Sequence, residues 1–125
     1  MQEETNNDLS AIEEQVCKTE KYIFFNGPFS AEHIEESLST LAAYWRLQSY
    51  QQSPSYSDHP SVSEKKGIFN EDLDAVKEKL ISPLKIGLTA FVKNFPNDKK
   101  GLALLERVKK CEEEISKIRN VIQKF

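Results

Sequence analysis

The chain has 125 residues and a formal net charge of −3, with 30% charged and 38% hydrophobic residues. This length and balance are typical of one globular domain with an apolar core and many exposed polar faces. Four glycines and five prolines are too few for a β fold with many turns, and the apolar runs are too short to span a membrane. Two cysteines do not form a disulfide framework, so we interpret them as buried free thiols.

Apolar residues recur at steps of three and four in four segments, which is the spacing of one helix face. The spacing predicts helices over about 8–25, 31–52, 71–95 and 98–124. We expect Ser30 and Asn70 to cap the second and third helices, because serine and asparagine are favoured at that position. In the third helix the apolar repeat slips at Pro83. A kink is expected there, because proline removes a helical hydrogen bond.

The apolar positions define one core-facing seam on each helix, and such seams favour helical neighbours crossing at about 20°. The seams of the first, second and fourth helices are Leu9, Ile12, Val16, Thr19 and Ile23; Ile34, Leu38, Leu41, Trp45 and Gln48; and Leu104, Val108, Cys111, Ile115, Ile118, Ile122 and Phe125. Two short connections and a long loop over 53–70 favour an all-α, antiparallel (up-down-up-down) four-helix bundle. We interpret residues 1–125 as its single domain. A coiled-coil dimer through the fourth helix stays open as an alternative.

The two ends of the chain differ in charge. Residues 1–30 carry six acids against two lysines, whereas residues 97–125 carry eight lysines or arginines against five acids. This asymmetry favours antiparallel packing between the first and last helices. The first ten residues, MQEETNNDLS, are acidic and polar, unlike a signal or transit peptide. We therefore predict a cytoplasmic, intracellular protein, although an effector exported by a dedicated machine needs no such peptide.

The side chains that catalysis or metal binding requires are scarce. His33 and His59 are the two histidines, and His33 precedes Glu36 in the reverse of the order that di-iron bundles use. The glycines stand apart and form no phosphate-binding loop. The sequence therefore predicts no enzyme activity, no catalytic residues, no cofactor and no metal site. An enzyme would need carboxylates and His33 to be clustered by the tertiary structure alone.

A basic stripe on the last helix is a candidate surface for nucleic-acid binding. Lys110, Lys117 and Lys124 recur every seven residues, with Glu106 and Glu113 beside them. Nucleic-acid-binding domains are usually basic overall and place aromatic residues among their lysines. A basic face diluted by acids is typical of a solvated helix. We therefore predict neither nucleic-acid binding nor membrane insertion.

The end of the second helix and the loop after it are rich in aromatic residues. The seam assigns Trp45 to the core, while Tyr44, Leu47 and Tyr50 lie beside it. Tyrosines are favoured anchors at protein interfaces. We therefore interpret Tyr44, Leu47 and Tyr50, with Tyr56 from the loop, as a partner-binding surface. The alternative is that the loop folds back and covers this face.

These observations together predict a non-enzymatic protein–protein interaction module, an adaptor or chaperone-like helical bundle. Its partner is another protein, and self-association is a further option. An inhibitor or immunity-type protein that blocks a single target is the alternative, as is an exported effector. Adaptors, immunity proteins and secretion chaperones share this general appearance, and no motif in the chain chooses among them.

Overall fold

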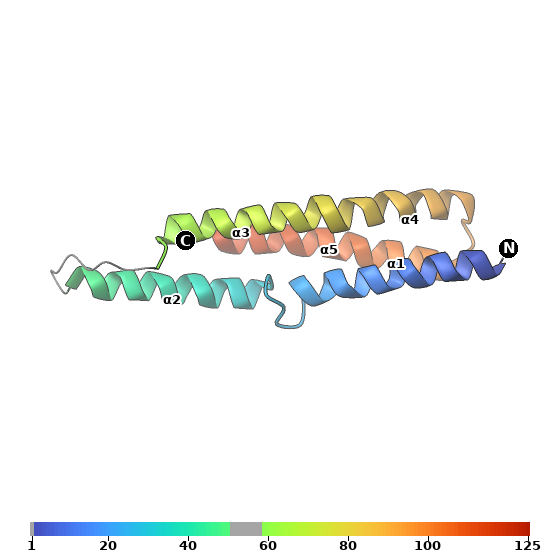
Figure 1. The fold of residues 1–125 in the computed structure, drawn as a ribbon. Helices are drawn as coiled ribbons and strands as arrows, with labels where there is room; N and C mark the ends of the chain where they lie inside the picture. Colours follow the sequence, from blue (N-terminus) through green and yellow to red (C-terminus); the bar gives the residue numbers. More distant parts are fainter. Residues whose placement is uncertain (1, 51–58) are drawn as a thin grey trace.

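The computed structural model describes residues 2–50 and 59–125, with side chains described from Leu9 onward. All regular elements within those ranges are helical. They are α1 (Gln2–Ile23), α2 (Ala31–Tyr50), α3 (Val62–Val76), the π-helical segment η1 (Lys77–Ile81), α4 (Ser82–Asn94) and α5 (Lys99–Gln123). Because α3, η1 and α4 follow one another without a break (Figure 1), the described residues form four helical stretches. The predicted all-α, four-helix class is confirmed.

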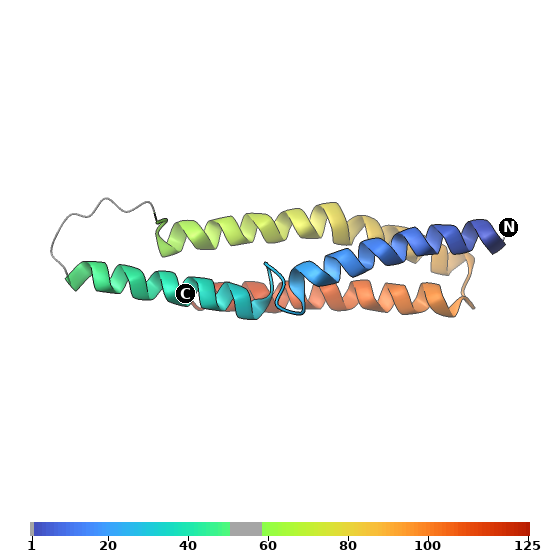
Figure 2. The same cartoon turned by 60° about the horizontal axis from the view of Figure 1, so that its bottom comes forward.

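The helices form an elongated bundle around α5, which contacts α1, α2, α3 and α4. Figure 1 and Figure 2 show α1 and α2 end to end along one side of the molecule, with the continuous helix α3–η1–α4 beside them. The chain therefore does not reverse between α1 and α2, and the up-down order predicted for this pair is wrong. Two helices placed end to end can each bury one apolar stripe on the long α5, so neither needs the other as a neighbour.

Ion pairs show that α1 and α5 run in the same direction. Glu13 Oε2 lies 3.0 Å from Lys100 Nζ, and Glu20 Oε1 lies 2.5 Å from Arg107 Nη2. From one pair to the other the residue number rises on both helices, from 13 to 20 on α1 and from 100 to 107 on α5, which requires a parallel arrangement. The antiparallel packing predicted from the charge asymmetry is therefore wrong. Opposite charges draw the two helices together, but a net charge on each segment carries no information about direction.

The pairing between α5 and the helix α3–η1–α4 is antiparallel. Lys85 Nζ lies 2.8 Å from Glu112 Oε1, and Arg119 is paired with Asp74. Residue numbers rise along α5 as they fall along the partner helix, as expected for neighbours joined by a short connection.

A double-mutant cycle tests the parallel register of α1 and α5. We expect Glu20→Ala and Arg107→Ala to show a coupling of about 1 kcal/mol in urea unfolding, because the pair is partly buried and doubly hydrogen-bonded. The matched cycle on Glu13 and Lys100 is expected to give only a few tenths of a kcal/mol, since both side chains are more exposed. Zero coupling between Glu20 and Arg107 would contradict this register.

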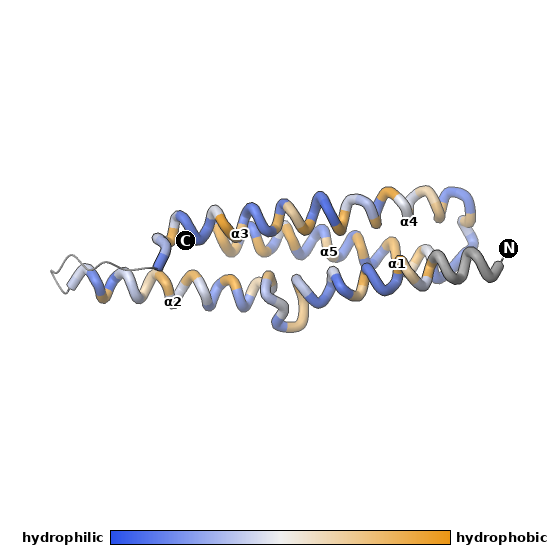
Figure 3. The backbone as a smooth tube through the Cα atoms, viewed as in Figure 1, coloured by the Kyte–Doolittle hydropathy of each residue, from blue (hydrophilic) through white to orange (hydrophobic). Residues whose placement is uncertain are grey.

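The core lies where the seams meet (Figure 3). Its buried members include Leu9, Val16, Thr19 and Ile23 from α1, Ile34 and Leu38 from α2, Leu73, Ile81 and Leu88 from the α3–α4 helix, and Leu104, Val108, Cys111, Ile115, Ile118 and Ile122 from α5. The predicted seam positions Leu41 and Trp45 are only half buried, and Phe125 is exposed. For the two α2 residues, the reason is that α2 extends past the ends of α3 and α5 (Figure 1), so in the described part of the chain no helix lies beside its last turns.

A tight turn over residues 24–30 separates α1 from α2. Phe25 and Asn26 adopt left-handed φ angles of 55° and 62°, which end α1 two residues earlier than expected. Gly27 is buried against the last turn of α1. The hydroxyl of Ser30 then accepts a backbone N–H at 3.3 Å, which confirms the predicted cap of α2.

The third helix begins at Val62 instead of residue 71, so the predicted loop over 53–70 is helical from Val62 onward; residues 53–58 lie outside the described residues. Ser61 is its N-cap, and its hydroxyl accepts a 3.1 Å hydrogen bond from the Glu64 N–H. A serine followed three residues later by glutamate is a capping-box sequence. The predicted cap Asn70 instead lies inside α3, next to the buried Phe69.

A π-helical turn, η1, lies beside the predicted kink position and ends two residues before Pro83; the kink itself stays a prediction. The N–H of Ser82 donates to the carbonyl of Lys77, five residues earlier. Since Pro83 has no N–H and its ring crowds the preceding turn, a wider turn in front of it lets the helix continue.

Candidate functional site

Two of the four predicted partner-binding residues are exposed at the projecting end of α2, the last turns of the helix that extend past α3 and α5. The side chains of Leu47 and Tyr50 are 63% and 77% exposed. They lie three positions apart, which places them on neighbouring parts of one helix face. Tyr56 lies outside the described residues. Tyr44 differs from its predicted role, because it is half buried.

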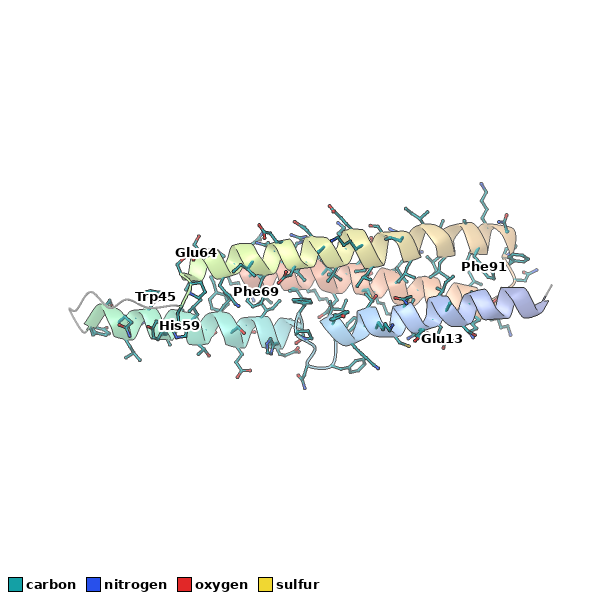
Figure 4. The ribbon with its side chains drawn as sticks, in the orientation of Figure 1. Glu13, Trp45, His59, Glu64, Phe69 and Phe91 are labelled. Carbon is teal, nitrogen blue, oxygen red and sulfur yellow. The ribbon has the colours of Figure 1, made fainter. Side chains whose placement is uncertain are left out.

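Tyr44 belongs to an aromatic cluster that joins α2 to the segment before α3. Its ring packs edge-on against Trp45 at 5.4 Å and lies 4.5 Å from the ring of His59, measured between centroids. The indole Nε1 of Trp45 donates a 2.8 Å hydrogen bond to the carbonyl of Pro60. Figure 4 shows Trp45 and His59 together at this junction. Trp45 is therefore a structural residue, as predicted, but at a junction between helices and not in the central core.

A pocket of about 600 Å³ lies between α2 and the start of α3. One wall is a continuous stripe of α2, consisting of His33, Glu36, Ser37, Thr40, Leu41 and Tyr44. The other wall is formed by His59, Pro60 and Lys65. This pocket was not predicted from the sequence, because residues 59–65 of its second wall were expected to lie in a loop. The signal that could have found it is the capping-box spacing of Ser61 and Glu64, which marks the start of α3 ahead of Lys65.

The pocket unites both histidines with Glu36 and Lys65, but it does not form an acid–base pair of carboxylates. Glu36 is the single carboxylate among its described lining residues, and it is exposed, as are His33 and His59. Over residues 9–50 and 59–125, whose side chains are described, no three His, Cys, Asp or Glu residues are grouped to hold a metal ion. The ammonium of Lys65 lies 5.0 Å from the centroid of the Phe69 ring, a cation–π contact. The pocket therefore contains groups that can bind a ligand. Of its described charged side chains, Lys65 is the one fixed by a defined contact.

A second polar cluster lies between α1 and α5 and has a structural role. The guanidinium of Arg107 donates to Glu20 at 2.5 and 3.2 Å and to Cys17 Sγ at 3.4 Å. The hydrogen bond to Glu20 is the main cause that raises the pKa of Arg107, so this cation is permanent. Burial raises the pKa of Cys111 to about 12, which keeps that thiol neutral. Both cysteines are free; Cys111 is buried as predicted, whereas Cys17 is half buried.

Comparison with known proteins gives no relative from which a role could be transferred. The chain matches no protein-family model, no curated protein and no solved structure. No helix in the described ranges has the length and apolar character needed to cross a membrane. The function therefore has to be inferred from the surfaces that the chain itself presents.

Proposed function

We propose that this chain is a non-enzymatic protein-interaction module that binds a protein partner through the projecting end of α2. The observation that carries the proposal is the exposure of Leu47 and Tyr50 on a helix that extends past its neighbours (Figure 1). Large apolar side chains held together in solvent are typical of interaction sites, and tyrosine is a frequent binding hot spot.

The projecting end is held in place by its attachment to the bundle. Ile34 and Leu38 are fully buried at the base of α2. Further along the helix, the Trp45 hydrogen bond to Pro60 ties α2 to the segment before α3. A surface that is ordered before binding loses less conformational entropy when the partner arrives, which favours affinity. The same attachment means that shortening Leu47 and Tyr50 leaves the core untouched.

The test is a Leu47→Ala/Tyr50→Ala double mutant. We expect its stability to change by no more than about 0.5 kcal/mol, because both side chains are exposed. Its affinity for the partner is expected to fall at least about 30-fold, since truncation of a hot-spot residue typically costs about 2 kcal/mol or more. The partner is first captured with a photo-crosslinking residue at position 50, and its Kd is then measured by calorimetry.

The matched control is Ile86→Ala, because Ile86 is 71% exposed but lies on α4. This variant is expected to bind the partner like the original chain. Equal loss of binding in Ile86→Ala, or unchanged binding in the double mutant, would contradict the proposal. One tight partner would indicate an inhibitor or immunity-type protein, whereas several weaker partners would indicate an adaptor.

A further inference from the structure

The pocket between α2 and α3 has an aromatic end and a charged middle. Tyr44, His59 and Pro60 form the aromatic end, where the rings of Tyr44 and His59 are 4.5 Å apart. After Pro60 the chain enters α3, which runs back alongside α2 (Figure 2). Lys65, in α3, lines the pocket together with the α2 stripe. Leu41 supplies an apolar surface between the two regions. A ligand that carries a flat ring and a charged group would therefore find complementary walls in this pocket.

Lys65 gives the pocket a defined positive charge. The residue is half buried, and its ammonium lies 5.0 Å from the centroid of the Phe69 ring. Among the described residues no carboxylate lies within 4 Å of it, whereas Lys85 and Lys100 each have an acidic partner. An ammonium packed against an aromatic ring on a half-buried residue has less access to water, and an anion offers it a charged hydrogen-bond partner. The N-terminal end of α3 also adds the positive end of a helix dipole.

The carboxylate of Glu36 contributes less to ligand selection than the ammonium of Lys65. Glu36 is exposed at the opposite end, beside His33. Solvent screens an exposed charge more strongly than a half-buried one, so Lys65 dominates the choice of ligand charge. The volume of about 600 Å³ falls within the roughly 300–1,000 Å³ that is usual for small-molecule sites.

We propose that this pocket binds a small aromatic carboxylate. The ring of the ligand lies against Tyr44, His59 and Pro60, and its carboxylate pairs with the ammonium of Lys65. Apolar contacts with Leu41 and the aromatic side chains supply most of the affinity, while the ion pair sets the preference for an anion. This site goes beyond the proposed protein-binding role and does not depend on it.

The test titrates the full chain, labelled with nitrogen-15, with indole-3-acetate while its amide NMR signals are recorded. We expect saturable shifts that are largest at Tyr44, His59 and Lys65. The neutral analogue indole-3-acetamide, which has the same ring, is expected to bind at least tenfold more weakly. Lys65→Met, which keeps the apolar stem but removes the charge, is expected to weaken indole-3-acetate binding by the same factor and to leave indole-3-acetamide binding unchanged.

The matched control is Lys66→Met, because Lys66 is the adjacent half-buried lysine and does not line the pocket. This variant is expected to bind indole-3-acetate with an unchanged Kd. Equal affinity for the acid and the amide would overturn the proposal, as would an unchanged Kd in Lys65→Met or shifts centred elsewhere. The comparison of acid and amide uses the original chain, so it decides the question even if Lys65→Met fails to fold.

Discussion

An aspartate in place of Val108 is expected to unfold the protein. Val108 is 1% exposed at the centre of α5, the helix that contacts all the others. A buried carboxylate without a partner typically costs several kcal/mol, compared with a total stability of about 5–15 kcal/mol for a domain. Circular dichroism at 222 nm is expected to show loss of helix, and the cooperative thermal transition is expected to disappear. Ile115→Asp, at 2% exposure, is expected to act in the same way.

The control on the same helix is Lys117→Glu. Lys117 is exposed, so reversing its charge is expected to change the stability by no more than about 0.5 kcal/mol. If Val108→Asp kept its helical signal and its melting temperature, α5 could not be the central helix of the fold. The comparison separates the effect of burial from the effect of placing a carboxylate on α5.

Gly27→Ala is expected to destabilise the protein by at least about 2 kcal/mol. A Cβ atom at this position would lie 2.0 Å from the carbonyl oxygen of Lys21 and 2.5 Å from that of Tyr22. Both are backbone atoms at the end of α1, so they cannot rotate away as a side chain could. The Tyr22 carbonyl also accepts a 2.9 Å hydrogen bond from the Phe29 N–H. Relief of the clash would therefore disturb the whole turn between α1 and α2.

The same substitution at Gly67, Gly67→Ala, is expected to stabilise the protein. Gly67 lies inside α3, and a Cβ there would meet no atom within 4 Å. Alanine is favoured over glycine in a helix by about 0.5–1 kcal/mol, because glycine loses more conformational freedom on folding. Urea unfolding of the two variants measures both effects. A Gly27→Ala variant as stable as the original chain would show that α1 and α2 are not joined by this close-packed turn.

The positions of most helices were predictable from local patterns. The apolar repeat alone assigns Ile34, Leu38 and Val108 to buried faces, and all three are buried. The cap at Ser30 was also predictable, because a capping side chain bonds to a backbone group only three residues away. Such features depend on neighbours in the chain, so they do not require knowledge of the fold.

The start of α3 was predictable in principle, although we placed it at residue 71. Ser61 and Glu64 have the spacing of a capping box, whereas Gly67 and Asn70 are residue types common in loops. In the structure Phe69 is buried, and its packing in the core supports the helix around Gly67. Tertiary packing therefore outweighs the weak local preference of glycine against helix. The same shift explains why the pocket formed by His59, Pro60 and Lys65 was not foreseen.

Only the tertiary structure decided how the helices are directed. An apolar stripe on α1 can face α5 in a parallel or an antiparallel arrangement, because the spacing of apolar residues is the same in both directions along a helix. The choice depends on the turn around Gly27, which sends α2 onward instead of back, and on ion pairs such as Glu20–Arg107. That choice also leaves the end of α2 projecting, with Leu47 and Tyr50 in solvent. Sequence periodicity identifies which face of each helix is apolar, but the partner that covers this face is a property of the folded chain.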